Sequence, residues 1–555
     1  MNAIRRRIAG STLCAVVLSL LAGCVGTNPI PAPVMGGKPR LVVLVIIDGL
    51  PQRQVVEYWD QLAPDGFKRF LDRGAWFTDA QYGYAYTVTG AGHATVLTGA
   101  YPHRSGIIGN EWRNPVTGET EYCAGDTSAT YIGHKTAKLD GTSPRNLKVE
   151  SLGDVMKRVD PRSKVIAISG KDRGAILPAG KSGVAYMYQA QTGQFASTTY
   201  YMKAHPKWVD AFNAKRAADA YFKAEWKPLL DDRAYARSLP DERKWYAKGG
   251  KLPKTVGEGQ DKPGPLFYGA LLPTPFGDDL TLAFARAAIA GEELGRDAAP
   301  DLLVVSLSSH DYINHAYGAE SRISHDHFLY LDRMLQDFLN DIDVTVGRDN
   351  YLAVLTADHG FMPAPEHSQS LGRDAGRING SQMLAKLNAA LAKRYGEGNW
   401  TLGFSAQAVV LNKPLIAEKK VNVVELSEEA RKALLAEPGV AAVYTRAELD
   451  GNTRAGAPLF DSMRNSWNRE LSGDLQVALK PYWMYGGAPT TTHGSPYPYD
   501  TNVPILFYGP SWVLPGRIDK HVEMADLAPT LAKILGVPAP SSCEGKPLPL
   551  ETIAK

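Results

Sequence analysis

Five short apolar runs, far apart in the chain, constrain its fold most strongly. They are LVVLVII (41–47), KVIAIS (164–169), DLLVVSLS (301–308), LAVLT (352–356) and VPILFYG (503–509). Apolar residues follow one another in these runs instead of alternating with polar ones, which is typical of strands covered on both faces. Helical stretches lie between the runs, such as 326–343. The pattern predicts an α/β fold, doubly wound, with a mostly parallel sheet between helices.

Two long segments interrupt the alternation of strands and helices. One, at about 199–275, is rich in Trp, Tyr, Lys and Pro. The other, at about 366–485, contains a helical stretch at 381–394 and a β-like stretch at 441–449. We interpret both as inserted cap segments on a single domain, 41–550, because each lies between elements of the same predicted core.

The first 24 residues, MNAIRRRIAGSTLCAVVLSLLAGC, resemble an export signal. Three arginines precede an apolar run from 13 to 22 that is too short to span a bilayer. The ending LAGC resembles a bacterial lipobox, so we expect a signal peptide at 1–23, lipidation of Cys24 and a Pro/Gly-rich tether at 24–40. Val25, which follows the cysteine, favours delivery of the lipoprotein to the outer membrane over retention in the inner membrane. The expected location is periplasmic or on the cell surface. The alternative is an ordinary cleaved signal with a chance cysteine.

Charge and cysteine content narrow the classes of partner. Residues 1–23 hold three arginines and no acid, so their removal leaves 58 basic residues against 58 acidic ones. A near-neutral chain is not typical of nucleic-acid binding, and we expect a monomer that meets the membrane only through its lipid anchor.

Two of the four cysteines, Cys123 and Cys543, lie outside the predicted signal and lipidation site. An oxidising compartment favours a disulfide between them, with two free thiols as the alternative.

Polar residues follow four of the predicted strands directly. Ligands of open α/β sheets bind beyond the carboxyl ends of the strands, which meet at one edge. The residues predicted to gather there are Asp48, Lys171, Arg173, Asp311, His315, Asp358 and His359. Each alone has a simpler interpretation as a turn or a surface pair; their arrival at one edge favours a site.

Three aspartates and three histidines, counting His493 before the last strand, offer six metal donors. Carboxylate and imidazole donors suit zinc. Six are too many for one tetrahedral ion with an open position, but they suit two ions with three protein ligands each. A cation there would also compensate the cost of burying Asp358 and His359 at the end of a core strand.

The stretch YTVTGAGHATVLTG (86–99) contains a candidate nucleophile. Thr89 precedes Gly-Ala-Gly and a helical stretch, where free N–H groups favour anions, and a metal would make its hydroxyl easier to ionise. The alternatives are that Thr89 only caps the helix, or that Thr87 is the nucleophile.

In combination these motifs resemble the alkaline phosphatase superfamily, and within it the bacterial PafA type, which has a threonine nucleophile. The resemblance covers most of the mature chain. It implies two Zn²⁺ ions, one held by Asp311, His315 and His493 and the other by Asp48, Asp358 and His359, with Thr89 beside the second. It also implies that three residues contact the phosphoryl oxygens: Asn110, Lys171 and Arg173.

The resemblance implies an alkaline phosphatase that hydrolyses small-molecule phosphate monoesters through a phospho-threonine intermediate. Lys171 and Arg173 support the monoester, because two cations projecting the same way from an extended segment favour a dianion. Solvated surface charge is the simpler interpretation of that pair. Two other functions stay open: a phosphodiesterase or nucleotide pyrophosphatase on the same scaffold, and a non-catalytic lipoprotein that binds metal or phosphate.

Overall fold

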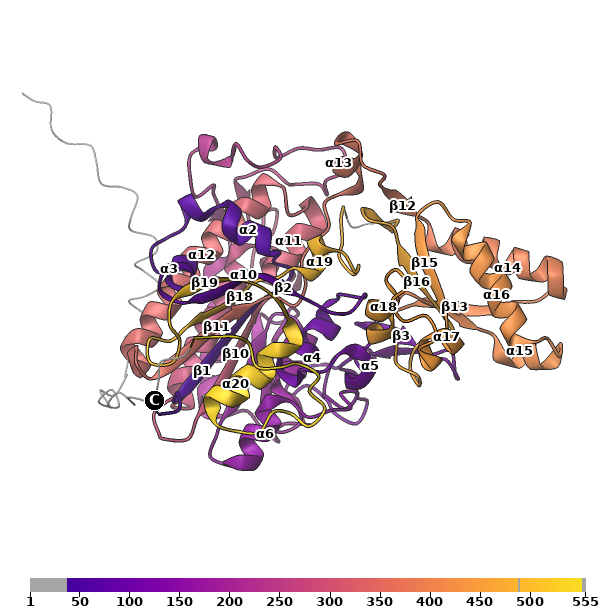
Figure 1. Ribbon diagram of the computed structural model, residues 1–555. Coiled ribbons are helices and arrows are strands. Elements are labelled where there is room, and N and C mark those ends of the chain that lie inside the picture. The colour runs from indigo at the N-terminus through magenta and orange to yellow at the C-terminus, as the bar shows by residue number, and fades with distance from the viewer. Residues whose placement is uncertain (1–36, 488–489, 552–555) are drawn as a thin grey trace, which may run out of the picture.

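The computed structural model describes residues 37–487 and 490–551 (Figure 1). The predicted signal peptide, Cys24 and the tether up to residue 36 lie outside the described residues. Among the described residues the main sheet has nine strands, in the spatial order β19-β2-β18-β11-β1-β10-β5-β6-β7. In chain order these are β1 (Leu41–Ile47), β2 (Ala75–Gln81), β5 (Val165–Ser169), β6 (Val184–Gln189), β7 (Gln194–Ala196), β10 (Asp301–Leu307), β11 (Tyr351–Thr356), β18 (Ile505–Tyr508) and β19 (Gly516–Glu523).

The centre of this sheet is parallel. Strand β1 pairs in parallel with both β10 and β11, and β10, β5 and β6 continue in parallel. Strand β18 runs antiparallel to both β11 and β2, and β7 is antiparallel at the edge. Every residue of β1, β10 and β11 is buried, as continuous apolar runs require. The mostly parallel α/β prediction is confirmed, and all five predicted strands form with ends within two residues of those expected.

Helices cover both faces of the sheet. One group packs together through α4 (Thr89–Thr98), α6 (Leu152–Val159), α7 (Asp172–Ala179) and α20 (Leu527–Leu535). The other comprises α10 (Pro275–Gly291), α11 (Ser309–Tyr317) and α12 (Arg322–Ile342), with α3 (Phe67–Arg73) beside α12. Because helices cover both faces, a ligand can reach this sheet at its edge.

The first predicted insertion is built onto the main core. It contains α8 (Lys207–Ala214), α9 (Pro265–Leu271) and the short pair β8 (Glu225–Trp226) and β9 (Lys254–Thr255). Helix α8 lies against β7 and α10, and Phe212 and Tyr235 belong to the same apolar cluster as the central strands. The segment is therefore continuous with the core on which it rests.

The second insertion has a sheet and an apolar cluster of its own, and it projects to one side of the molecule (Figure 1). Its sheet order is β13-β14-β16-β15, comprising Thr401–Ser405, Ala408–Leu411, Leu475–Leu479 and Val440–Thr445. Helices α14 (Gly380–Tyr395) and α16 (Val423–Leu435) cover it. The β-like stretch at 441–449 is only half a strand: it turns at Thr445 into α17 (Arg446–Gly451).

The predicted disulfide is not present, and both cysteines are free thiols. Cys123 lies against Gly90 in the first turn of α4, whereas Cys543 lies against Gly99 just beyond the end of that helix. Nine residues of helix separate those two glycines by about 13 Å, far beyond disulfide reach. Within the described ranges, no helix is long and apolar enough to cross a membrane.

Candidate active site

The predicted ligands meet at the carboxyl edge of the parallel strands. Asp48 follows β1, Asp311 lies in the first turn of α11 after β10, and Asp358 follows β11. The backbone N–H of Gly49 donates to Oδ1 of Asp358 over 3.0 Å, which joins the ends of β1 and β11. The antiparallel strand β18 begins where its neighbour β11 ends, so the loop before it brings His493 to the same edge. Four segments far apart in sequence thus converge.

The three aspartates are buried, and each keeps an oxygen that no hydrogen-bond donor of the described residues satisfies. These atoms are Oδ1 of Asp48, Oδ1 of Asp311 and Oδ2 of Asp358. A buried carboxylate oxygen without a donor costs free energy unless a cation compensates it.

Imidazole nitrogens surround the unsatisfied oxygens. His359 Nε2 lies 3.4 Å from Oδ1 of Asp48. Nε2 of His315 and Nε2 of His493 lie 3.4 and 3.6 Å from the same oxygen, Oδ1 of Asp311. Two groups of three donors fall within 4.8 Å of one another: Asp48, Asp358 and His359, and Asp311, His359 and His493. The first is a predicted set, and the second replaces His315 with His359.

Each of the three histidines is oriented by a backbone carbonyl. The Nδ1 atoms of His315, His359 and His493 lie 3.0, 2.9 and 2.9 Å from the carbonyl oxygens of Thr491, Gly360 and Thr87. A proton on Nδ1 that is donated to a carbonyl leaves the lone pair on Nε2, the tautomer that binds a metal. The donor set therefore fits divalent cations in both composition and orientation.

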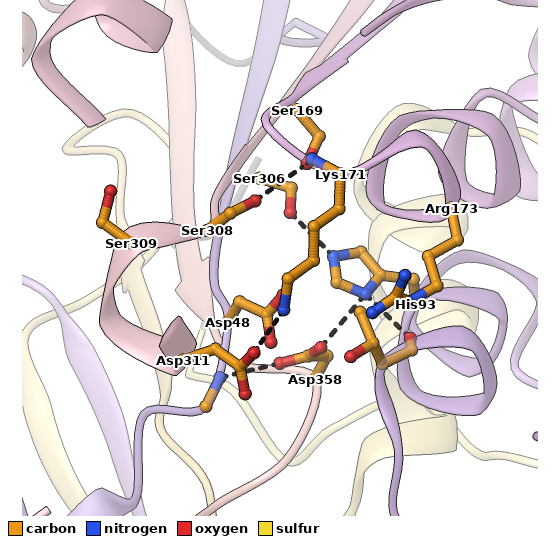
Figure 2. Close-up of polar contacts among 12 residues, drawn as sticks. Asp48, His93, Ser169, Lys171, Arg173, Ser306, Ser308, Ser309, Asp311 and Asp358 are labelled. Atoms are coloured by element: carbon orange, nitrogen blue, oxygen red, sulfur yellow. Dashed lines mark hydrogen bonds and ion pairs between the residues drawn. The ribbon is translucent and has the colours of Figure 1, made fainter. Parts of the chain in front are cut away.

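Lys171 supplies positive charge between the carboxylates. Its ammonium lies 2.6 Å from Oδ2 of Asp48 and also contacts Oδ2 of Asp311 (Figure 2). It lies 4.8 Å from the ring centre of Tyr312. Burial would raise the pKa of Asp48, but Lys171 and then His359 hold it well below the ordinary value. In this arrangement Lys171 binds the carboxylates.

The local geometry predicted for Lys171 and Arg173 is wrong. Lys171 is extended, but α7 begins at Asp172, so the two side chains do not share the face of an extended segment. The Arg173 guanidinium instead donates to the Tyr122 hydroxyl over 3.3 Å, and Tyr122 contacts Asp172. Burial would lower the pKa of Arg173, but Tyr122 and Asp172 raise it well above its usual value. Its Nε has no partner among the described residues.

Thr89 begins α4, and its hydroxyl does not cap the helix. The N-cap position belongs to Val88, and Oγ1 of Thr89 lies 3.5 Å from Nε2 of His359. The competing Thr87 donates its hydroxyl to the carbonyl of Ser495 over 3.0 Å. Of the two candidates, Thr89 alone faces the predicted metal ligands.

Two residues hold the first turn of α4 against the site. The Asn110 side-chain oxygen accepts the N–H of Gly90 over 2.7 Å, which leaves its amide nitrogen for a ligand at the same helix end. His93 lies 2.9 Å from the carbonyl of Thr89, 2.8 Å from Ser306 Oγ and 3.2 Å from Oδ2 of Asp358 (Figure 2). His93 and Tyr122 are supporting residues outside the predicted metal ligands and phosphoryl contacts; for His93 the sequence allows a role in orienting ligands. The spacing Gly-x-Gly-His was the signal for the first, and no sequence signal marks the second.

The negative charge of the aspartates changes the pKa of His359. Burial would lower the pKa of this histidine, but Asp358 and Asp48 raise it to about 9. At His493 burial prevails and, together with His359, holds the pKa well below the usual value. Cations would lower the electrostatic energy of this cluster most at the aspartates.

Comparisons with known proteins agree with the geometry. A sequence model described as type I phosphodiesterase / nucleotide pyrophosphatase matches residues 42–501. A protein of Myroides odoratus named a calcium-transporting ATPase is 35% identical, covering 92% of this chain and 94% of its own. Alkaline phosphatase PhoV of Synechococcus elongatus is 33% identical, covering 94% of each.

The crystal structure of wild-type alkaline phosphatase PafA is similar over the whole fold. Its TM-score is 0.86 at 31% identity, covering 94% of this chain and 99% of that one. A second PafA structure, with a TM-score of 0.85 at 30% identity, covers the same shares and carries substitutions at one threonine, one asparagine, one lysine and one arginine. With the family match extending over most of its length, this chain belongs to the type I phosphodiesterase / nucleotide pyrophosphatase family.

Proposed function

We propose that this chain is an alkaline phosphatase that hydrolyses phosphate monoesters with two zinc ions through a phospho-threonine intermediate. One observation carries the proposal: the hydroxyl of Thr89 is free of any capping bond and faces His359, beside three buried carboxylates with unsatisfied oxygens. The alkaline phosphatase relatives support the same activity.

The residues present fit two ions. Asp48, Asp358 and His359 would hold one ion next to Thr89, and Asp311, His315 and His493 would hold the other. When bound, the ions would supply Lewis-acid charge at the attacking and departing oxygens. The mixed carboxylate and imidazole donors favour zinc over Mg²⁺ or Ca²⁺, which prefer oxygen ligands alone.

In this proposal Thr89 is the nucleophile, and other residues of the chain position the phosphoryl group. The Thr89 oxygen attacks phosphorus in line, a Thr89–phosphate bond forms, and the bond from phosphorus to the alcohol oxygen breaks. Water next attacks the phospho-threonine, which releases phosphate and restores Thr89. Arg173 and the Asn110 amide hold phosphoryl oxygens, and Lys171 exchanges a carboxylate contact for one of them.

Three groups for the phosphoryl oxygens favour a monoester over a diester. A monoester is a dianion with three terminal oxygens, whereas a diester presents two and a second organic group. The substituted PafA variant supports the choice of these four residues. Its altered threonine and asparagine are 21 positions apart, as are Thr89 and Asn110, and its altered lysine and arginine are two apart, as are Lys171 and Arg173.

The decisive experiment is metal analysis combined with turnover of nitrophenyl phosphate and its bis-ester. We expect two zinc ions per chain, faster cleavage of the monoester, and loss of both activity and metal on chelation. Thr89→Ala should keep its zinc but lose turnover. Faster cleavage of the bis-ester would favour a phosphodiesterase, the function named by the family, and phosphate held without turnover would favour a binding lipoprotein.

The proposed cellular setting rests on residues outside the structure. We expect removal of residues 1–23, a lipid on Cys24, display on the outer membrane and a monomeric enzyme. Mass spectrometry of the mature N-terminus tests the lipid, and Cys24→Ser should release the enzyme from the membrane fraction.

A further inference from the structure

A cavity of about 520 Å³ lies beside the candidate active site. The lining residues that matter here are Trp245, Tyr246, Tyr312, His315, Glu366 and Arg377. Cavities of about 300–1,000 Å³ are typical of small-molecule sites. The two insertions and the core each contribute to its wall. Of these six residues, His315 alone has a role in the proposed reaction, as a metal ligand.

The cavity opens on one particular half of the site. His315 lines it and places Nε2 3.4 Å from Asp311. Tyr312 also lines it, with its ring 4.8 Å from the Lys171 ammonium. Under the proposed function this is the half that receives the departing alcohol oxygen, so the group attached to that oxygen enters the cavity.

The first insertion supplies two aromatic rings that are held in place. The carbonyl of Trp245 accepts the hydroxyl of Thr490 over 2.6 Å, and the Arg243 guanidinium lies 5.8 Å from the centre of its ring. Tyr246 packs edge-on against Tyr317 on α11, with ring centres 6.1 Å apart. Rings fixed in this way bind flat groups at a low cost in conformational entropy.

The part of the wall formed by Glu366 and Arg377 carries no net charge. The Arg377 guanidinium donates to both oxygens of Glu366, over 2.8 and 2.9 Å, and to the carbonyl of Thr490 over 2.6 Å. Because the guanidinium is compensated by that carboxylate, this wall does not favour a second phosphate or another anion. The cavity thus offers rings and a neutral polar wall.

We infer that this cavity is a leaving-group subsite that selects monoesters whose alcohol carries an aromatic ring next to the ester oxygen. The inference rests on the proposed phosphatase function. It gives the aromatic-rich first insertion a role in specificity, with Trp245 as its central residue.

The test compares kcat/KM for benzyl, cyclohexylmethyl and methyl phosphate, whose primary alcohols are similarly poor leaving groups. The wild-type enzyme should prefer the benzyl ester over both others. In Trp245→Ala the ratio of kcat/KM for benzyl over methyl phosphate should fall about tenfold, the scale of one lost aromatic contact plus its buried area. Tyr200→Ala, an exposed tyrosine of the same insertion, is the matched control and should keep the ratio.

The outcomes separate the two proposals. Equal rates for the benzyl and cyclohexylmethyl esters, or an unchanged ratio in Trp245→Ala, would overturn the subsite and leave the phosphatase intact. Turnover of none of the three esters would overturn the phosphatase itself. If Trp245→Ala fails to fold, inhibition of the wild-type enzyme by benzylphosphonate against methylphosphonate decides: tighter binding of the benzyl compound supports the subsite, and equal binding ends it.

Discussion

The two predicted sets of metal ligands differ in how they are built. We call Asp48, Asp358 and His359 the closed half, and Asp311, His315 and His493 the open half. Asp48, Asp358 and His359 are fully buried and directly follow the adjacent strands β1 and β11. In the other half the side chain of His315 is 27% exposed, and its partners come from a helix and from the loop before β18. The closed half, beside Thr89, suits a covalent step that excludes water. The open half, beside the cavity, suits exchange of the alcohol for water.

The largest effect is expected from the closed half. Asp358→Asn keeps the shape of the side chain and the oxygen that accepts from Gly49, but removes the charge. We expect kcat/KM to fall by ~10⁴-fold with loss of one zinc ion, since both nucleophile activation and metal binding depend on this charge. Metal analysis and monoester kinetics check it. Asp332→Asn, at a buried aspartate on α12 whose carboxylate accepts the N–H groups of Ala63 and Phe67, should leave turnover per folded molecule unaltered.

Lys171 joins the two halves, and its loss should appear in the stability of the metal-free protein. Burial would lower its pKa, but Asp311 and Asp48 raise it. A raised lysine pKa stabilises the fold below the unfolded value of about 10.4 and is lost as pH rises through the folded value. The lowered pKa of Asp48 adds stability above about 4, which is lost in acid.

Between these limits, Lys171→Met should cost the metal-free protein ~3–5 kcal/mol in the free energy of unfolding, because two carboxylates stay buried without their cation. The metal-loaded protein should lose less. Urea unfolding with and without zinc at pH 5, 7 and 9 measures the difference. Equal losses in both forms would show that Lys171 does not compete with metal for these carboxylates.

The open half should tolerate damage better. His315→Ala removes one partly exposed donor, and we expect kcat/KM to fall by ~10²-fold with partial recovery in excess zinc, since water can fill the vacated position. His521→Ala, at an exposed histidine on β19, is the control. A loss as large as that of Asp358→Asn would remove the distinction between the halves.

The smallest effect is kinetic. On addition of a chelator, the ion of the open half should leave first, by a factor of ~10 in rate, because His315 gives solvent access that the closed half lacks. Two phases of zinc release, with activity lost in the first, would support the distinction between the open and closed halves. A single phase would mean that the two ions leave together.

Much of this arrangement could be predicted from sequence for a definite reason. Strands covered on both faces are continuous apolar runs, and parallel strands end at one edge, so a polar residue after each run marks a shared location. Asp48, Asp311 and Asp358 are all of this kind. His493 reaches the same edge only because β18 is antiparallel, which the apolar run at 503–509 does not reveal.

The features of the site and fold that the sequence did not predict depend on main-chain atoms or on local geometry. The carbonyls of Thr87 and Thr491 that orient two histidines could belong to any residue, so no pattern marks them. The extended geometry expected for Lys171 and Arg173 failed because α7 begins between them. The half-strand at 441–449 did carry a signal: Thr445 and Glu448 form a capping box that starts a helix there.

The reversed direction of β18 also bears on when the site can form. The candidate donors extend from Asp48, at the end of the first strand of the main sheet, to His493, which joins the sheet edge through one of the last strands to be synthesised. A chain that is still emerging from the ribosome holds at most five of these six candidate donors until residue 493 has been made. Under the proposed function, a complete set of ligands therefore exists only after nearly all of this sequence has been made, so tight binding of metal belongs to the last stage of folding.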